Sequence, residues 1–160
     1  MKNNIDRSIQ KAQSECSRTG LRLTDKRCKV LKILLQAAEP LSAYDIADQF
    51  KTSYDESLSA MSAYRMLDFL MHANFVHKLE TSNQYLACSH ICCEHEHELP
   101  QFLICDQCHT VKEIGLRKQL LNELKDSIES SGFVLSSQQI ELHGTCDNCL
   151  RKQAEINDTI

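Results

Sequence analysis

Residues 62–88, SAYRMLDFLMHANFVHKLETSNQYLAC, decide the fold because the hydrophobic period changes within them. In the first half, apolar residues recur at helical spacing, and Ser59 or Ser62 can cap the helix that they form. Asn74 follows as a residue that tolerates the left-handed conformation at a helix end. From residue 75 onward, FVHKLE and QYLAC have the composition of short strands around the turn sequence TSN. This stretch therefore predicts a helix followed by a β-hairpin.

Further helices are predicted ahead of this stretch. A modest helix covers residues 4–19, and Thr24 is placed to cap the amphipathic run DKRCKVLKILLQAA. Ser42 and Asp45 form a capping box for the short helix AYDIADQF, and the polar residues 51–58 predict a turn. Three helices that lead into a hairpin are typical of a winged helix-turn-helix, a module whose third helix enters the major groove of DNA.

The two halves of the chain differ in charge and in metal-binding residues. Residues 1–80 carry 12 Lys and Arg against 10 Asp and Glu, whereas residues 81–160 carry 6 against 12. Seven of the nine cysteines and five of the seven histidines lie in the second half, which indicates a separate metal-binding domain. We expect a DNA-binding domain over 1–82, a hinge at 83–88, a metal-binding domain over 89–152 and a flexible tail over 153–160.

Composition indicates the cellular compartment of the protein and the broad class to which it belongs. With 42% hydrophobic and 25% charged residues, the chain has the composition of a globular protein rather than a disordered one. No apolar run reaches the ~20 residues that a membrane helix needs, and the N-terminus lacks the apolar core of a secretory signal. We therefore expect a cytoplasmic protein with no membrane partner. Because thiols stay reduced there, the cysteines indicate metal or redox chemistry rather than disulfides.

The second half also contains recognisable secondary structure. QFLIC and TVKEI predict strands that flank a cysteine pair, and FVLSSQQIELHG predicts a later strand. Between them, LRKQLLNELKDSIESS has the period of an amphipathic helix. The expected inner face of this helix consists of Leu116, Leu120, Leu121, Leu124 and Ile128.

Two CxxC pairs, Cys105 with Cys108 and Cys146 with Cys149, are the most specific local signal. A gap of two residues lets both thiolates of a pair face one ion, and two pairs complete a tetrahedral shell of four sulfurs. Such a site is structural because it leaves no coordination position open for a reaction. A redox pair and an iron-sulfur site of the rubredoxin type are the alternatives to zinc.

Several stretches together resemble the ferric uptake regulator family, and within it the branch of zinc uptake regulators. The matching runs are RLTDKRCKVLKIL, LSAYDIAD, SAYRMLDFLMHANFVHKLETSNQYLAC, FLICDQCHTVKEI and IELHGTCDNC, in order over roughly residues 15–150. The resemblance implies an α+β fold with an N-terminal winged helix-turn-helix and a C-terminal α/β dimerisation domain that contains a structural zinc. It also implies a homodimer. The family's usual Lys-Pro-x-Thr-Val-Tyr-Arg run is replaced by SAMSAYR, which lacks the proline and the basic residue.

The resemblance further implies a second, regulatory zinc site, so that each chain would bind two Zn²⁺ ions. Its ligands would be His77, Cys88, Glu113 and a histidine of the following loop, His97 or alternatively His95. A mixed shell of sulfur, nitrogen and oxygen suits zinc, and the thiolate disfavours Fe(II) and Mn(II). The simpler interpretation of the same pattern is that these residues lie on the surface and bind no metal. Possible members of a further weak site are Cys92, Cys93 and His90.

Candidate DNA contacts lie in and before the expected recognition helix. Arg65 can donate two hydrogen bonds to the edge of guanine. Tyr44 and Tyr64 are candidates for base or phosphate contact, although Tyr64 could equally be packed in the protein. The expected phosphate contacts are Ser62, Arg22, Lys26 and Arg27.

With these candidate sites, the family resemblance implies a zinc-responsive repressor of zinc-uptake genes, which binds double-stranded operator DNA as a zinc-loaded homodimer. An iron- or peroxide-responsive regulator of the same family is the alternative. We expect neither an enzyme nor a small organic substrate, because a zinc enzyme needs an open coordination position and a general base. A thiol oxidoreductase would need a reactive CxxC at the start of a helix.

Overall fold

A computed structural model describes residues 2–92, 100–137 and 139–157 of the chain. The chain divides into two compact units, Met1–Glu94 and His95–Ile160, and each is described by itself. In the part of the chain that the structure describes, no helix is both long and apolar enough to cross a membrane.

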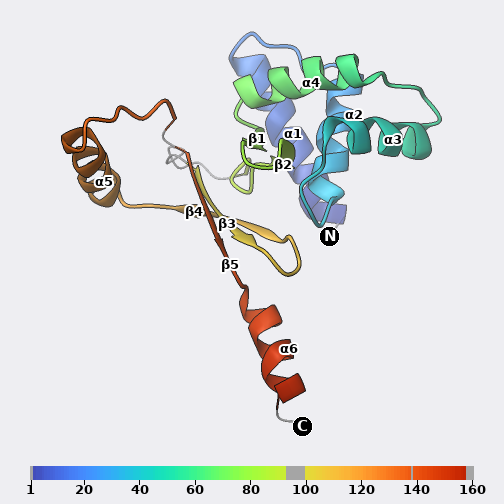
Figure 1. The fold of residues 1–160 in the computed structure, drawn as a ribbon. Coiled ribbons are helices and arrows are strands. Elements are labelled where there is room, and N and C mark those ends of the chain that lie inside the picture. The colour runs from blue at the N-terminus through green and yellow to red at the C-terminus, as the bar shows by residue number, and fades with distance from the viewer. Residues whose placement is uncertain (1, 93–99, 138, 158–160) are drawn as a thin grey trace. The chain divides into compact units, whose positions relative to one another are not determined.

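The first unit has four helices and a hairpin among its described residues (Figure 1), as the sequence predicts. In the antiparallel hairpin, His77 lies opposite Leu86. The class is therefore α+β with an N-terminal winged helix-turn-helix, which confirms the expected fold. The elements are α1 (Lys2–Arg18), α2 (Asp25–Gln36), α3 (Ala43–Tyr54), α4 (Ala60–His72), β1 (Val76–Leu79) and β2 (Gln84–Ala87).

Local hydrogen bonds set the ends of these helices. The amide of Ser42 donates to Oδ2 of Asp45 at 2.9 Å, and the amide of Asp45 donates to Oγ of Ser42 at 3.1 Å, which is the predicted capping box. Ser59 rather than Ser62 caps α4, because its Oγ accepts from the amide of Ser62 at 3.2 Å. Asn74 has a φ of +59° just beyond α4, in the predicted left-handed conformation.

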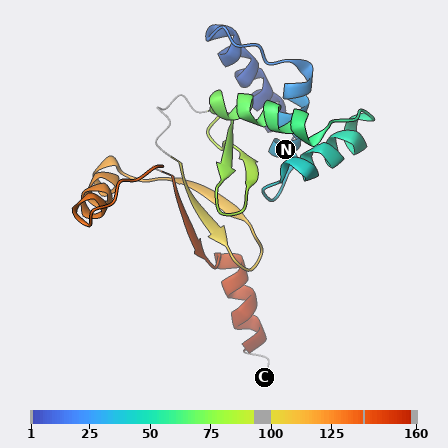
Figure 2. The same cartoon turned by 45° about the horizontal axis from the view of Figure 1, so that its top comes forward.

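Helices α1, α2, α3 and α4 of the first unit pack together with the hairpin (Figure 2), and the core lies between them. Helix α2 contributes Val30, Leu31, Ile33 and Leu34, as its sequence period predicts. From α3 comes Phe50, whose side chain is completely buried. Helix α4 contributes the buried residues Ala63, Leu67 and Leu70.

The predicted hinge at residues 83–88 is wrong. Residues 84–87 form β2, which pairs with β1 along its whole length. On its other side, Tyr85 exchanges two backbone hydrogen bonds with Leu41, at 2.7 and 2.9 Å. The boundary between the units follows Glu94, so the expected boundary at residue 82 lies inside the hairpin. Strand pairing on both sides, which a linear pattern does not show, explains the difference.

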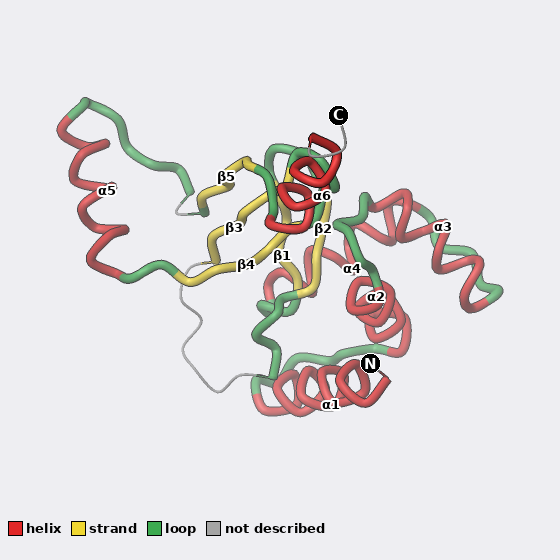
Figure 3. The backbone as a smooth tube through the Cα atoms, turned by 90° about the horizontal axis from the view of Figure 1, so that it is seen from below, coloured by secondary structure: helices red, strands yellow, loops and turns green. Residues whose placement is uncertain are grey.

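The second unit contains a three-stranded sheet in the order β4-β3-β5 (Figure 3). Strand β3 pairs antiparallel with β4 and parallel with β5, with Phe102 opposite Glu113 on one side and Glu141 on the other. Helix α5 connects β4 to β5 and stands away from the sheet in every view. The elements are β3 (Pro100–Cys105), β4 (Val111–Gly115), α5 (Lys118–Ser130), β5 (Ile140–Gly144) and α6 (Asp147–Asn157).

Four further expectations need correction. Helix α3 extends to Tyr54, so the predicted turn at 51–58 is partly helical. The late strand is confined to Ile140–Gly144. Helix α6 extends to Asn157, so part of the predicted flexible tail is helical. The expected inner face of α5 contributes no buried residue within the chain, and Leu120 is 48% exposed.

Candidate metal centres and nucleic-acid surface

The four CxxC cysteines come together in the second unit. Their Sγ atoms all lie within 4.8 Å of one another, with Cys105 and Cys149 at 3.9 Å and Cys108 and Cys146 at 3.7 Å. A tetrahedron with zinc–sulfur bonds of about 2.3 Å has sulfurs separated by about 3.8 Å. The thiols are therefore spaced as zinc ligands, and they are far beyond the ~2.05 Å of a disulfide.

Backbone geometry positions each cysteine pair. Cys105 ends β3, and the turn after it closes with a hydrogen bond of 2.9 Å from the amide of His109 to the carbonyl oxygen of Cys105. Cys146 precedes α6 and Cys149 lies in its first turn. The two pairs meet because Cys105 is opposite Gly144 in the parallel β3–β5 ladder. The ladder thus connects the start of the unit to its end.

Hydrogen bonds give these thiols unequal acidities. Amide donors, that of Cys146 first and then that of Cys108, lower the pKa of Cys105 to about 6. The hydroxyl and amide of Thr110 lower the pKa of Cys108. The pKa of Cys149 is raised to about 12, chiefly by its contact with Cys146. A divalent cation would stabilise all four as thiolates, so the donor set fits zinc.

Thr110 and the contact between His143 and Asp106 were not predicted from the sequence. Nδ1 of His143, on β5, lies 2.8 Å from Oδ1 of Asp106, inside the first CxxC. The amide of Asp106 also donates to the carbonyl oxygen of Gly144 at 2.9 Å. These bonds hold the first cysteine turn against β5. No sequence motif marks them, because the contacts span about 40 residues of chain.

A second group of candidate ligands lies on the wing of the first unit. His77 faces Leu86 across the hairpin, and Cys88 is two residues further along, so His77 and Cys88 share one face. The amide of Cys88 donates to Phe75 at 2.9 Å, which fixes the end of the hairpin. A ring nitrogen of His77 and Sγ of Cys88 lie within 4.8 Å of each other. Cys88 is 2% exposed, and its Sγ accepts from the amide of His90 at 3.4 Å.

The other candidates for this group are placed differently. Glu113 lies on β4, in the second unit. His95, His97 and Cys93 lie outside the described residues. The thiol of Cys92 lies 3.4 Å from Oγ of Ser8, which connects this segment to α1. Among the described residues, neither Cys92 nor His90 belongs to a cluster of three metal-binding side chains.

Cys16 and Cys28 lie in the helices of the first unit, as expected of small apolar residues. Cys16 is 1% exposed and Cys28 is half-buried, and burial raises the pKa of both thiols.

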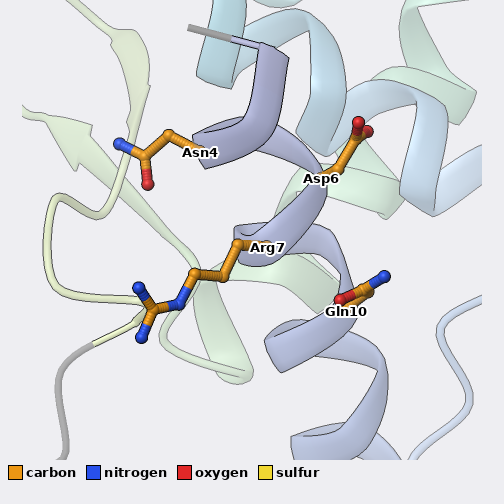
Figure 4. A pocket seen from close by; sticks show the side chains of 4 residues that line it. All are labelled: Asn4, Asp6, Arg7 and Gln10. Carbon is orange, nitrogen blue, oxygen red and sulfur yellow. The ribbon is translucent and has the colours of Figure 1, made fainter.

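The polar face of α1 presents four side chains around an open hollow (Figure 4). They are Asn4, Asp6, Arg7 and Gln10. One of them, Asp6, pairs with Lys32 of α2 at 3.7 Å, so this face connects two helices.

The predicted DNA contacts fall into two groups. Arg65 and Arg22 are exposed, and Tyr44 is 64% exposed. Tyr64 is half-buried, and its ring meets that of Tyr44 edge to face at 6.5 Å. Ser62 accepts a hydrogen bond of 2.9 Å from the hydroxyl of Ser59, which leaves its own hydroxyl hydrogen able to donate.

Arg27 and Lys26 interact with the protein itself. The guanidinium carbon of Arg27 lies 3.6 Å from the centroid of the Phe69 ring, and its Nη1 donates to the carbonyl oxygen of Arg22 at 2.7 Å. The Nζ of Lys26 lies 4.0 Å from Glu56. The exposed residues Arg22 and Arg65 are therefore better placed to reach DNA than Arg27.

Comparison with known proteins identifies the family of this chain. The profile of the ferric uptake regulator family matches residues 18–143, most of the chain. The chain belongs to the ferric uptake regulator family. It is 32% identical to the zinc uptake regulation protein of Escherichia coli (strain K12) over 146 residues, which cover 91% of this chain and 83% of that protein.

Two solved structures of the family are also similar to this chain. One is described as a zinc uptake regulator complexed with zinc and DNA, with a TM-score of 0.80 and 29% identity over 94% of this chain and 97% of that one. The other is the crystal structure of holo XcZur, with a TM-score of 0.72 and 36% identity over 89% of this chain and 96% of that one.

Proposed function

We propose that this family member is a zinc-responsive transcriptional repressor that binds operator DNA as a zinc-loaded homodimer and represses zinc-uptake genes. The observation that carries the proposal is the similarity of nearly the whole chain to a zinc uptake regulator solved with zinc and DNA. The exposed Arg65 on α4 and the four-sulfur geometry of the second unit support the proposal.

Two zinc ions per chain are proposed, with different roles. Cys105, Cys108, Cys146 and Cys149 would hold a structural ion, because four protein thiolates leave no position for exchange with solvent. The regulatory ligands would be His77, Cys88, Glu113 and His97, with His95 as the alternate. Zinc bound at either position would fix its ligands in a tetrahedral shell and carry out no reaction.

The regulatory ligands suggest how DNA binding depends on metal. His77 and Cys88 belong to the hairpin next to α4, whereas Glu113 belongs to the sheet of the second unit. A shared ligand shell would connect the two units and restrict their relative orientations. Both recognition helices of a dimer could then reach successive major grooves with less loss of conformational entropy.

Exposed apolar residues of the second unit support the homodimer. In α5, Leu120 is 48% and Leu124 is 40% exposed, and in the following segment Phe133 is 72% and Val134 is 86% exposed. On the sheet, Leu142 is 50% exposed. A second copy would cover such surface, since an amphipathic helix needs a partner for its apolar face.

Iron- or peroxide-dependent regulation is the alternative within the family. The buried thiol of Cys88 next to an imidazole disfavours it, because thiolate ligands select zinc over Fe(II) and Mn(II). Competition between Zn²⁺ and Fe(II) for the purified dimer decides between the two.

DNA affinity as a function of free zinc tests the proposed function. The DNA is a duplex enriched by repeated selection from a random pool with zinc-loaded protein, and fluorescence anisotropy reports binding. We expect zinc to raise the affinity of the wild type by about 5- to 150-fold, the usual range of allosteric coupling. Cys88→Ser should lose this response, whereas the control Cys28→Ser should keep it. A Cys88→Ser protein with the full zinc response, or a wild type indifferent to zinc, would contradict the proposal.

A further inference from the structure

Met61 is an exposed apolar side chain in a unit that buries most of its apolar residues. Among the large hydrophobic side chains described in the first unit, Met61 at 65% and Tyr44 at 64% are the most exposed. Met61 is the second residue of α4, and Tyr44 is the second residue of α3. Burial of apolar surface favours folding, and an exposed methionine contributes little to it. The core of the unit thus gives no reason for an apolar residue at this exposed position.

The neighbours of Met61 show what this face of α4 is suited to bind. Arg65 follows by four residues, so the two exposed side chains lie next to each other on the helix. Ala63 and Leu67 are completely buried and define the core-facing side of α4. The first turn of the helix contains no acidic residue that would repel phosphate.

The helix end that carries Met61 is well defined. The Oγ of Ser59 accepts from the amide of Ser62 at 3.2 Å and donates to its hydroxyl at 2.9 Å, so α4 begins at Ala60. Residues in the first turn of a recognition helix are the ones that contact base edges. Met61 therefore occupies a position from which a side chain can reach the floor of the major groove.

From this placement we infer that Met61 contacts the C5-methyl group of a thymine and contributes to operator specificity, an inference that rests on the proposed function. The thymine methyl is the apolar group that bases present in the major groove. Four residues of helix rise about 6 Å, and base pairs are spaced about 3.4 Å apart. The thymine should thus lie about two base pairs from the guanine that Arg65 contacts.

Replacement of thymine by deoxyuracil tests the inference, because it removes the methyl group and leaves the hydrogen-bonding groups unchanged. The duplex is the one enriched from a random pool by zinc-loaded wild-type protein, with each thymine replaced in turn. We expect one position per half-site at which the replacement weakens binding about fourfold, the value of one buried methyl group. Met61→Ala should bind the thymine and uracil duplexes equally.

Two further variants separate an apolar contact from a general effect on α4. Met61→Leu should keep the preference for thymine, and Met61→Gln, which has similar length and a polar end, should lose it. Circular dichroism should show an unchanged fold for all three variants, because the side chain is 65% exposed.

Two results would overturn the inference while the proposed function stands. One is a wild-type protein that binds every uracil-substituted duplex as tightly as the original. The other is a Met61→Ala protein whose ratio of thymine to uracil affinity equals that of the wild type. If zinc-loaded protein enriched no duplex from the pool, the proposed function itself would fail, and this inference with it.

Discussion

The two units of this chain are stabilised by different means. In the first unit, side chains such as Leu31, Ile46 and Phe50 are completely buried in one core formed by several helices and the hairpin. In the second unit, the buried side chains that the structure describes are Gln101, Phe102 and Cys105, all on β3. Because hydrophobic burial is the main favourable term in folding, the first unit can fold through its own core. The proposed zinc ion and second copy would supply the stabilisation that the second unit lacks.

Loss of the four-sulfur site should have the largest effect and should be confined to the second unit. Structural zinc contributes on the order of 10–16 kcal/mol in small zinc domains, and the few buried residues around β3 do not replace it. In Cys105→Ser, hydrogen exchange should show unprotected amides in β3, β4 and β5, while α2 and α4 stay protected. Equal protection of the sheet in the variant and in a Cys28→Ser control would contradict the difference between the units.

Phe50→Ala should have the converse effect. Its ring is completely buried in α3, and the loss of such a side chain costs about 3–5 kcal/mol. Thermal melting should show the first unit unfolding earlier, with the four-sulfur site still able to retain one zinc ion. Simultaneous loss of that ion would mean that the two units do not fold independently.

Leu124→Glu should disrupt the association of two copies and leave the fold of one copy unchanged. Its side chain is 40% exposed on α5, so burial of the exposed part in a dimer contributes about 1 kcal/mol per copy. Loss of this burial from both copies removes about 2 kcal/mol and weakens dimerisation about 30-fold. Analytical ultracentrifugation measures this. Asn122→Glu places the same charge on the opposite side of α5 and should remain dimeric. If both variants dimerise equally, the exposed face of α5 does not form the interface.

Ser42→Ala should produce the smallest change, in the first unit only. Removal of the helix cap costs about 1 kcal/mol. Hydrogen bonds from the hydroxyl and amide of Ser42 lower the pKa of Asp45, so their contribution is present above the usual carboxylate pKa of about 3.9 and disappears as the pH falls through the lowered value. The difference in unfolding free energy between wild type and variant, measured by denaturant titration, should therefore shrink below about pH 4. A difference that is constant with pH would exclude this role for Asp45.

The sequence predicts local features well and features that depend on distant contacts poorly. The capping of α3 by Ser42 and the left-handed conformation of Asn74 depend on neighbouring residues in the sequence. The structure confirms both predictions. The hinge at 83–88 is wrong because pairing of Tyr85 with Leu41 is not visible in a linear pattern. The interaction of Arg27 with Phe69 was missed for the same reason.

The same limit applies to the second unit and to the metal sites. The spacing of the two CxxC pairs is sufficient to predict that the four thiols lie together, because four cysteines at this spacing are typical of a structural zinc site. The face of α5 was expected to be buried, and within this chain it is not, since its partner would belong to a second copy. The ligand role of Glu113 and the choice between His95 and His97 remain predictions from the resemblance.

A stepwise chelator titration of the purified protein, with bound zinc, DNA anisotropy and far-UV circular dichroism followed on the same sample, tests the account most directly. We predict two zinc ions per chain. Removal of the first should abolish DNA binding with the circular dichroism unchanged, and removal of the second should unfold the sheet of the second unit. A protein that still bound its duplex after losing the first ion, or that lost both ions and its fold in a single step, would contradict separate regulatory and structural sites.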